Sequence, residues 1–276
     1  MIVCTARGPF NVHRTGDGGP PVLMLHPLAL SGAVWDPVAR SLGESHRVTA
    51  LDARGHGASG WDGGPFTVDD MAADASSVIE ALDLGPAHVV GLSMGGSTAV
   101  VLAQRRPDLV ATLVLADTTA CYGPGRENRW AERARQAIGV PRETQLEFQL
   151  DRWFSPGFVR DRRAEADRVA KIFLATDSRA HAAACTALGG LDATGGLAGI
   201  RARTLVLVGE QDYATPPAMA ETLAAGIPDA VLRVLPDTRH MSLIERTETW
   251  QPIARHLAGD PAADLVPGDV RERRDG

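Results

Sequence analysis

Short apolar runs that alternate with helical segments constrain the fold of this chain more than any other feature of its sequence. The runs are rich in β-branched residues and bounded by turns, which indicates strands that are buried on both faces. Between them, residues 67–83 and 95–106 have helix-compatible patterns, the first opening on Thr67 followed by two acids. Strands alternating with helices predict an α/β fold, a mostly parallel central sheet with helices on both faces. The six clearest runs are Val22–Leu25, Val48–Leu51, Val89–Val90, Leu113–Ala116, Thr204–Val208 and Val231–Leu235.

The alternation stops between about residues 120 and 190, where no strand is evident. This stretch is rich in arginine and glutamate, and Pro141 and Pro156 interrupt its helical segments. We therefore expect a helical cap inserted over the carboxyl edge of the sheet. The predicted organisation is a core domain in two parts (1–119 and 191–258), a helical cap (120–190) and a flexible tail (259–276) rich in Pro, Gly, Asp and Arg.

A glycine-flanked serine follows the third apolar run and opens a helix. The segment is Gly91-Leu92-Ser93-Met94-Gly95-Gly96, a G-x-S-x-G pattern. In such a strand-turn-helix the serine hydroxyl is raised above the sheet, and the glycines let strand and helix pass without collision. Taken alone, the same turn is compatible with a serine that merely caps the helix. The strand before it and the helix after it favour Ser93 as a nucleophile.

A serine nucleophile requires a base, and the base requires an acid that orients it. His240 follows the last apolar run and Asp212 follows the run before it, so both lie at the carboxyl ends of strands, where open α/β sheets bind ligands. The order Ser93, Asp212, His240 is the one used with this kind of nucleophile turn. Glu210, in the same turn as Asp212, and Asp117, at the end of the fourth run, remain alternative acids.

The turn after the first apolar run predicts an oxyanion hole. His26-Pro27-Leu28 follows Val22–Leu25, and in this arrangement two backbone amides, here those of Leu28 and Met94, stabilise the oxyanion. We expect His26 to fix the loop rather than to act as a base. The glycine-rich loop Asp52–Ser59 is expected to be structural, with Arg54 donating to backbone carbonyls.

Other kinds of site find no support in the sequence. No phosphate-binding or dinucleotide-binding glycine pattern and no metal-ligand spacing is present, so we expect neither a cofactor nor a metal. The formal net charge is −6, without a basic block, which argues against nucleic acid or a membrane surface as a partner. Three widely spaced cysteines, no signal-peptide pattern and no membrane-length apolar run predict a cytoplasmic protein.

Together these motifs resemble those of the α/β-hydrolase superfamily, over roughly residues 10–257. A narrower resemblance is to 3-oxoadipate enol-lactonases, and Asp117 stands where that family leads us to expect an uncharged residue. It rests on four segments, which are Leu115–Thr118, Arg152–Phe158, Asp212–Pro217 and His240–Glu245. The resemblance implies a cofactor-free serine hydrolase that opens a small enol-lactone or ester through an acyl-enzyme on Ser93. A carboxylesterase or perhydrolase of secondary metabolism, and a non-catalytic scaffold that binds a ligand, remain alternatives.

A lactone that carries a free carboxylate would need a cation in the cap. Arg129, Arg133 and Arg152 are candidates, because a guanidinium group binds a carboxylate through two hydrogen bonds. Trp130 and Trp153 are expected to form walls of the same pocket. For each arginine taken singly, an exposed position on a helix remains the alternative.

Overall fold

An eight-stranded sheet forms the centre of the molecule in the computed structural model, which describes residues 1–260. Its strand order is β1-β2-β4-β3-β5-β6-β7-β8. β1 and β2 pair antiparallel, as do β2 and β4, and all other neighbours are parallel. The strands are β1 (Ile2–Thr5), β2 (Gly8–Thr15), β3 (Pro21–Leu25), β4 (Arg47–Leu51), β5 (Ala87–Leu92), β6 (Val110–Ala116), β7 (Arg203–Gly209) and β8 (Val231–Leu235). The predicted α/β fold is confirmed.

All six predicted strands are present, but the prediction omits the hairpin of β1 and β2 at one edge of the sheet. Phe10 and Val12 of β2 are buried while their neighbours are partly exposed, so β2 has the period-2 alternation of a strand covered on one face. Because the other strands are continuous apolar runs, this weaker alternating pattern was not part of the prediction.

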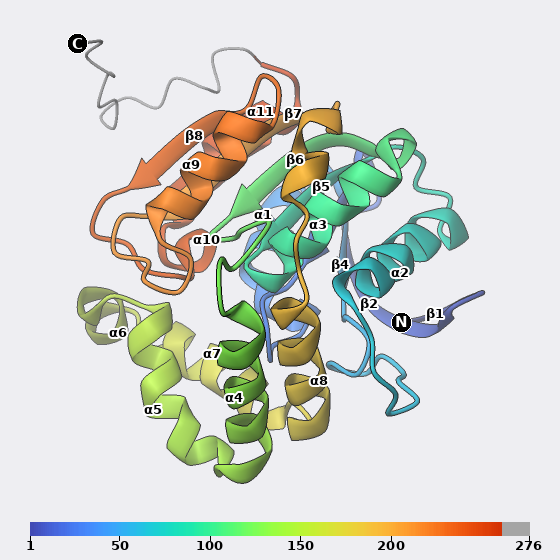
Figure 1. Ribbon diagram of the computed structural model, residues 1–276. Helices are drawn as coiled ribbons and strands as arrows, with labels where there is room; N and C mark the ends of the chain where they lie inside the picture. Colours follow the sequence, from blue (N-terminus) through green and yellow to red (C-terminus); the bar gives the residue numbers. More distant parts are fainter. Residues whose placement is uncertain (261–276) are drawn as a thin grey trace.

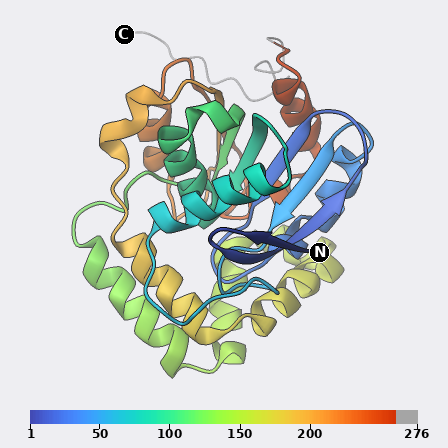
Figure 2. The ribbon, with the colours of Figure 1, turned by 90° about the vertical axis from the view of Figure 1, so that its right-hand side faces the viewer.

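Helices cover both faces of the sheet (Figures 1 and 2). α2 (Val68–Ala81), α3 (Met94–Arg105) and α9 (Pro217–Gly226) lie on one face, and α1 (Asp36–Leu42) and α11 (Trp250–Leu257) on the other. α2 begins where the sequence predicts, because Thr67 and Asp70 form a capping box in which each side chain accepts from the other residue's backbone N–H. The remaining short elements of the core are η1 (Gly32–Trp35), η2 (Pro107–Leu109), η3 (Thr194–Gly199), α10 (Ser242–Glu245) and η4 (Thr247–Thr249).

A helical insertion, α4–α8, lies over the carboxyl end of the sheet (Figure 1). The chain enters and leaves it through two segments that run side by side: Cys121 and Asp192 form an antiparallel bridge, and the Ala193 N–H donates to the Ala120 carbonyl at 2.9 Å. Its helices are α4 (Arg126–Gly139), α5 (Arg142–Trp153), α6 (Pro156–Asp161), α7 (Arg163–Ala175) and α8 (Ser178–Gly189).

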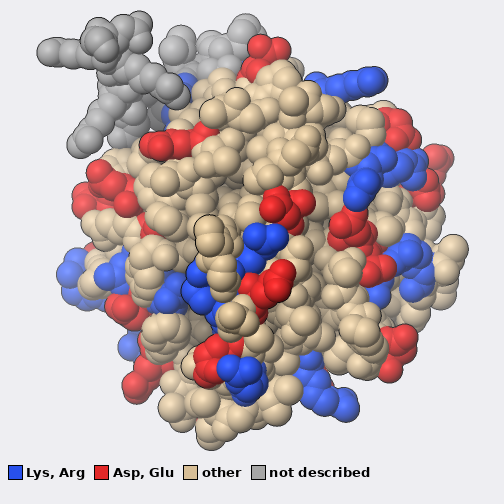
Figure 3. Space-filling model, in the orientation of Figure 1, with Lys and Arg blue, Asp and Glu red and all other residues tan. Residues whose placement is uncertain are grey.

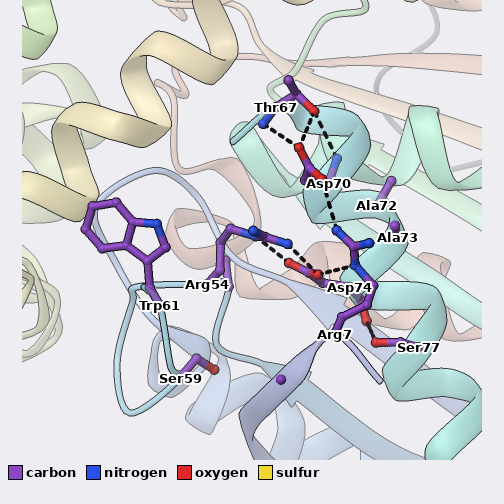
Figure 4. Close-up of polar contacts among 12 residues, drawn as sticks. Arg7, Arg54, Ser59, Trp61, Thr67, Asp70, Ala72, Ala73, Asp74 and Ser77 are labelled. Carbon is purple, nitrogen blue, oxygen red and sulfur yellow. Dashed lines mark hydrogen bonds and ion pairs between the residues drawn. The ribbon is translucent and has the colours of Figure 1, made fainter. Parts of the chain in front are cut away.

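The loop after β4 is structural as predicted, but Arg54 does not donate to backbone carbonyls. Its guanidinium makes two hydrogen bonds of 2.6 Å to the carboxylate of Asp74 on α2, and Arg7 from the β1–β2 turn donates to the same carboxylate at 2.7 Å (Figure 4). The prediction was wrong because the nearly buried Asp74, which needs a cationic partner, becomes a neighbour of Arg54 only through tertiary packing.

The predictions on membrane spans, cysteines, surface charge and the C-terminal tail can be compared with the structure only over residues 1–260. Within residues 1–260 no helix is long and apolar enough to cross a membrane. Cys4, Cys121 and Cys185 are all free thiols. On the face shown in Figure 3, Lys and Arg side chains are interspersed with Asp and Glu. Of the predicted flexible tail, 259–276, residues 261–276 lie outside the described part of the chain.

Candidate active site

Ser93 lies in a tight turn between β5 and α3. Its backbone adopts φ 55° and ψ −117°, a left-handed conformation that is uncommon for a residue with a side chain. Three hydrogen bonds hold the turn: the Ser93 N–H donates to Ala116 O at 2.9 Å, and Ser93 O accepts from the Ser97 N–H at 2.9 Å and the Thr118 hydroxyl at 2.7 Å. The strained conformation is therefore fixed by the surrounding structure.

The glycines on either side of Ser93 are required by close backbone packing. A Cβ added to Gly91 would lie 2.5 Å from Gly95 O, and one added to Gly95 would lie 2.1 Å from Leu25 O. Because both obstacles are backbone atoms, they could not move aside without displacing β3 or α3. These contacts explain the G-x-S-x-G pattern as a requirement of the strand-turn-helix geometry.

The structure brings Ser93, His240 and Asp212 into one chain of hydrogen bonds. The Ser93 Oγ lies 2.8 Å from His240 Nε2, and His240 Nδ1 lies 2.7 Å from Asp212 Oδ2. All three side chains are buried. With Nδ1–H donating to the Asp212 carboxylate, Nε2 is free to accept the serine proton, which is the arrangement needed to activate a hydroxyl nucleophile.

Neither of the two alternative acids is hydrogen-bonded to His240. Asp117 is buried, and its two oxygens accept from the backbone N–H groups of Gly209 and Ser242. Glu210 is exposed, and its Oε2 accepts from the Asp237 N–H at 3.4 Å. In this structure the carboxylate that is hydrogen-bonded to His240 therefore belongs to Asp212.

Asp212 is held in place by Thr215, a residue that the sequence prediction missed. The Asp212 Oδ1 accepts from the N–H groups of Ala214 (2.8 Å) and Thr215 (3.1 Å), and the Thr215 hydroxyl donates to Oδ2 at 2.8 Å. This local turn, in which an aspartate binds the backbone two and three residues later, has a sequence signal in Asp212-x-x-Thr215.

The electrostatics of the pair favour an ionised acid and a basic imidazole. Burial alone would raise the pKa of Asp212, but the positive charge of His240 and its hydrogen bond hold that pKa below its usual range. Burial would lower the pKa of His240, yet the charge and hydrogen bond of Asp212 raise it above its usual value. His240 is thus a stronger base than an isolated histidine.

Of the two residues predicted to supply oxyanion-hole amides, Met94 follows Ser93 in the chain and Leu28 lines the same cavity as Ser93. Leu28 and Met94 are buried, and within residues 1–260 neither backbone N–H donates to an acceptor. His26 fixes the loop that precedes Leu28, because its Nδ1–H donates to Pro27 O at 2.8 Å and its Nε2 accepts from the Ala53 N–H at 3.0 Å. The bond accepted by Nε2 requires neutral His26, and burial lowers the pKa of His26 accordingly.

A narrow cavity at Ser93 continues into a wide one of about 930 Å³ between the helical insertion and the core. Ser93, His240, Leu28 and Trp153 line the narrow part. The residues common to both parts form the passage between them, and they are Tyr122, Trp130, Arg133, Gln149, Arg152 and Ala214. A small molecule that reaches Ser93 from the wide part must therefore pass two arginines.

Arg133 and Arg152 carry guanidinium groups without acidic partners. Arg133 lies over the Trp130 ring, 5.0 Å from its centroid, and Arg152 lies between the rings of Phe148 (5.0 Å) and Tyr213 (4.5 Å). Within residues 1–260 neither guanidinium makes a hydrogen bond or an ion pair. Burial and the positive charge of Arg133 lower the pKa of Arg152, so an anion in the passage would relieve two like charges.

Arg129 differs from the other two arginines. Its guanidinium donates to the carbonyls of Pro124 (2.6 Å) and Tyr122 (2.7 Å), and it lines only the wide part of the cavity. Because these carbonyls, which precede α4, already bind its guanidinium, Arg129 is the least available of the three arginines to a ligand. Within the described residues 1–260, no group of three or more His, Cys, Asp or Glu side chains could hold a metal.

Comparison with known protein families assigns the chain. Residues 20–247 match the family model described as alpha/beta hydrolase fold, and the chain belongs to this family. It is 27% identical over 231 residues to 3-oxoadipate enol-lactonase 2 of Acinetobacter baylyi, covering 84% of this chain and 85% of the relative.

Two solved structures show the same architecture over nearly the whole chain. The enol-lactonase from Burkholderia xenovorans LB400 has a TM-score of 0.87 at 27% identity, covering 94% of this chain and 100% of that one. A thermophilic esterase from Thermogutta terrifontis, solved with malate bound, has a TM-score of 0.85 at 29% identity, covering 94% and 98%. The predicted resemblance to enol-lactonases is confirmed as a resemblance, and both structures are of hydrolases.

Proposed function

We propose that this chain is a serine hydrolase that opens a small lactone or ester carrying a carboxylate, through an acyl-enzyme on Ser93. The observation that carries the proposal is the hydrogen-bonded set Ser93–His240–Asp212 at the end of a cavity whose passage holds two unpaired guanidinium groups. The enol-lactonases among its relatives make 3-oxoadipate enol-lactone the first substrate to test.

Acylation follows from the positions of the three side chains. The Ser93 Oγ attacks the ester carbonyl while its proton passes to His240 Nε2, and Asp212 stabilises the imidazolium that forms. The carbonyl oxygen becomes an oxyanion, and we assign its stabilisation to the Leu28 and Met94 amides. When the tetrahedral intermediate collapses, the ring C–O bond breaks and His240 returns the proton to the leaving oxygen.

Deacylation repeats these steps with water. His240 removes a proton from the water that attacks the acyl carbonyl, the Ser93 ester bond breaks, and Ser93 regains its proton from His240. All atoms and protons balance with the substrate and one water molecule. The proposed reaction therefore needs no cofactor.

Recognition of the carboxylate is assigned to Arg133 and Arg152. Both lie in the passage to Ser93, both are partly buried, and both lack an acidic partner within the described part of the chain. The aromatic rings that hold them fix the cations in position without neutralising their charge. A carboxylate bound there would accept charge-assisted hydrogen bonds, which are stronger than neutral ones.

The experiment compares 3-oxoadipate enol-lactone with its neutral methyl ester. Arg133→Met and Arg152→Met should each raise KM for the anionic lactone by about 10-fold or more, since a hydrogen bond to a charged group contributes roughly 1.5–3 kcal/mol. KM for the methyl ester should change less than about twofold. Arg129→Met, one helical turn from Arg133, is the matched control and should leave both values near wild type.

Other results would reject parts of the proposal. Failure of a fluorophosphonate probe to label Ser93 would mean that the fold serves here as a non-catalytic scaffold. Labelling of Ser93 with turnover of linear esters but of no lactone would show an esterase. Equal KM values for the anionic and neutral lactones would show that the protein does not recognise a carboxylate on its substrate.

A further inference from the structure

A second buried carboxyl group, that of Asp117, lies beside the proposed triad and has no role in the steps above. Asp117 directly follows β6, and its side chain is 0% exposed. Its φ of 46° lies in the left-handed region, and its N–H donates to Leu207 O at 2.9 Å. A buried carboxyl group and a positive φ each cost free energy, so their occurrence at one residue calls for a compensating role.

The two oxygens of Asp117 bind two different segments of the backbone. Oδ1 accepts from the Gly209 N–H at 3.0 Å, and Oδ2 accepts from the Ser242 N–H at 2.8 Å. Gly209 ends β7, three residues before Asp212, and Ser242 lies two residues after His240. One carboxyl group therefore joins the segment that carries the acid to the segment that carries the base.

These segments are packed too closely to tolerate a shift of one against the other. A Cβ added to Gly209 would lie 2.4 Å from both Thr238 O and Arg239 O. The Gln211 N–H also donates to Thr238 O at 2.9 Å. Asp117 adds two hydrogen bonds to this junction, one to each segment.

The chemistry of the site requires a carboxyl group here rather than an amide. Two backbone N–H groups need two acceptor oxygens, whereas asparagine offers one oxygen and an NH₂ group that would face the second donor. Burial and the charge of Asp212 raise the pKa of Asp117 above its usual range, while His240 and the hydrogen bonds from Ser242 and Gly209 act in the opposite direction.

We infer that Asp117 is a positioning residue, whose carboxyl group clamps the Asp212 and His240 segments so that the hydrogen-bonded chain to Ser93 stays closed. The inference rests on the proposed function, because it assigns Asp117 a part in the reaction of Ser93. Asp117 acts through the other residues and touches no substrate.

The test measures kcat, KM and the pH dependence of kcat/KM for Asp117→Asn and Asp117→Ala with a short ester. Asp117→Asn, which leaves one N–H without an acceptor, should lower kcat by about 10-fold or more, because small misplacements of catalytic groups have large effects. KM should stay within about twofold of wild type. The acid limb of kcat/KM should move to lower pH as His240 loses its well-placed partner.

A matched control separates this role from a loss of stability. The Thr204 hydroxyl donates to Ala202 O at 2.8 Å at the opposite end of β7, and its side chain is likewise 0% exposed. Thr204→Val should lower the melting temperature and leave kcat and the acid limb unchanged. If Asp117→Asn behaves like Thr204→Val, the inference is overturned, and Asp117 is only a structural residue.

Labelling of Ser93 separates failure of this inference from failure of the proposed function. A fluorophosphonate probe that does not label the wild-type protein overturns both. A probe that labels wild type and both Asp117 variants at equal rates overturns only the role of Asp117. Slower labelling of the folded Asp117→Asn variant, with labelling of Thr204→Val at the wild-type rate, is the result that supports it.

Discussion

The buried histidine His56 should make the folded chain sensitive to mild acid. His56 is 0% exposed, its Nδ1–H donates to Arg54 O at 3.0 Å, and its Nε2 has no partner within the described residues. Burial, together with the nearby His26, lowers its pKa to about 3. The free energy of unfolding is then unaffected by His56 above pH 6.5, the ordinary pKa, and decreases as the pH falls from 6.5 towards 3, because only the unfolded chain gains the proton.

The size of this effect follows from the pKa difference. At about pH 5 the medium lies roughly 1.5 units below the unfolded pKa, and each unit corresponds to about 1.36 kcal/mol, so His56 alone should cost about 2 kcal/mol of stability. His26 and His181 are also buried with lowered pKa values, so the wild-type protein should lose more than this. The contribution of His56 must therefore be isolated by substitution.

His56→Asn keeps a donor near Arg54 O but does not titrate, and it provides the comparison. Urea unfolding is measured for wild type and variant at about pH 7 and at about pH 5. For each protein, the difference between the two free energies of unfolding is its loss of stability on acidification. The loss should be about 2 kcal/mol smaller in the variant, whatever its absolute stability. The same loss in both proteins would show that His56 is already charged, or hydrated, in the folded state, and would refute the reasoning.

Further outcomes concern the proposed triad and the core. Ser93→Ala should lower kcat by about 10⁶ and Asp212→Asn by about 10⁴, measured with a short ester; near-normal activity of Asp212→Asn would reject Asp212 as the acid. In wild type, kcat/KM should fall as the pH decreases through the raised pKa of His240, because only neutral imidazole accepts the Ser93 proton. If the acid limb of kcat/KM lay well below pH 6.5, the pairing of His240 with Asp212 would be contradicted. Asp74→Asn should destabilise the fold by about 3 kcal/mol, measured by urea unfolding, since it leaves Arg54 partly buried without its carboxylate; a loss below about 1 kcal/mol would mean that solvent replaces it.

The fold and the approximate site could be predicted because they depend on patterns along the chain. Continuous apolar runs mark parallel strands that are covered on both faces, and the carboxyl ends of such strands meet at one edge. Residues that follow neighbouring strands, such as Ser93, Asp212 and His240, therefore come together in any sheet with this alternation. The hairpin of β1 and β2 has only a short alternating pattern and was not predicted.

The sequence favoured Asp212 as the acid but left Asp117 and Glu210 as alternatives, because the choice depends on how each turn directs its carboxylate. Each of the three follows β6 or β7, so their positions along the chain do not distinguish them. The difference lies in local bonds: Thr215 and the backbone after Asp212 hold its carboxylate against His240, while Glu210 faces outward. Such differences of a few ångströms are decided by tertiary packing.

The same limit applies to the arginines of the insertion. Arg129 and Arg133 are one turn apart on α4, so a helical pattern gives them the same face. They differ because Arg129 lies close to the start of the helix, where two carbonyl groups take up its donors, whereas Arg133 lies beside the passage to Ser93. Availability of a cation to a ligand depends on these neighbours and not on helical position.

The segment that carries His240 is also bound to the end of α5, the helix that carries Arg152. The Met241 N–H donates to Trp153 O at 3.0 Å, and the Arg239 guanidinium donates to Asp151 Oδ1 at 2.8 Å. Arg152, one of the two proposed carboxylate-binding cations, lies between these two contacts on α5. Asp117 also binds this segment and the end of β7, so the segment that carries His240 is held between the core and α5.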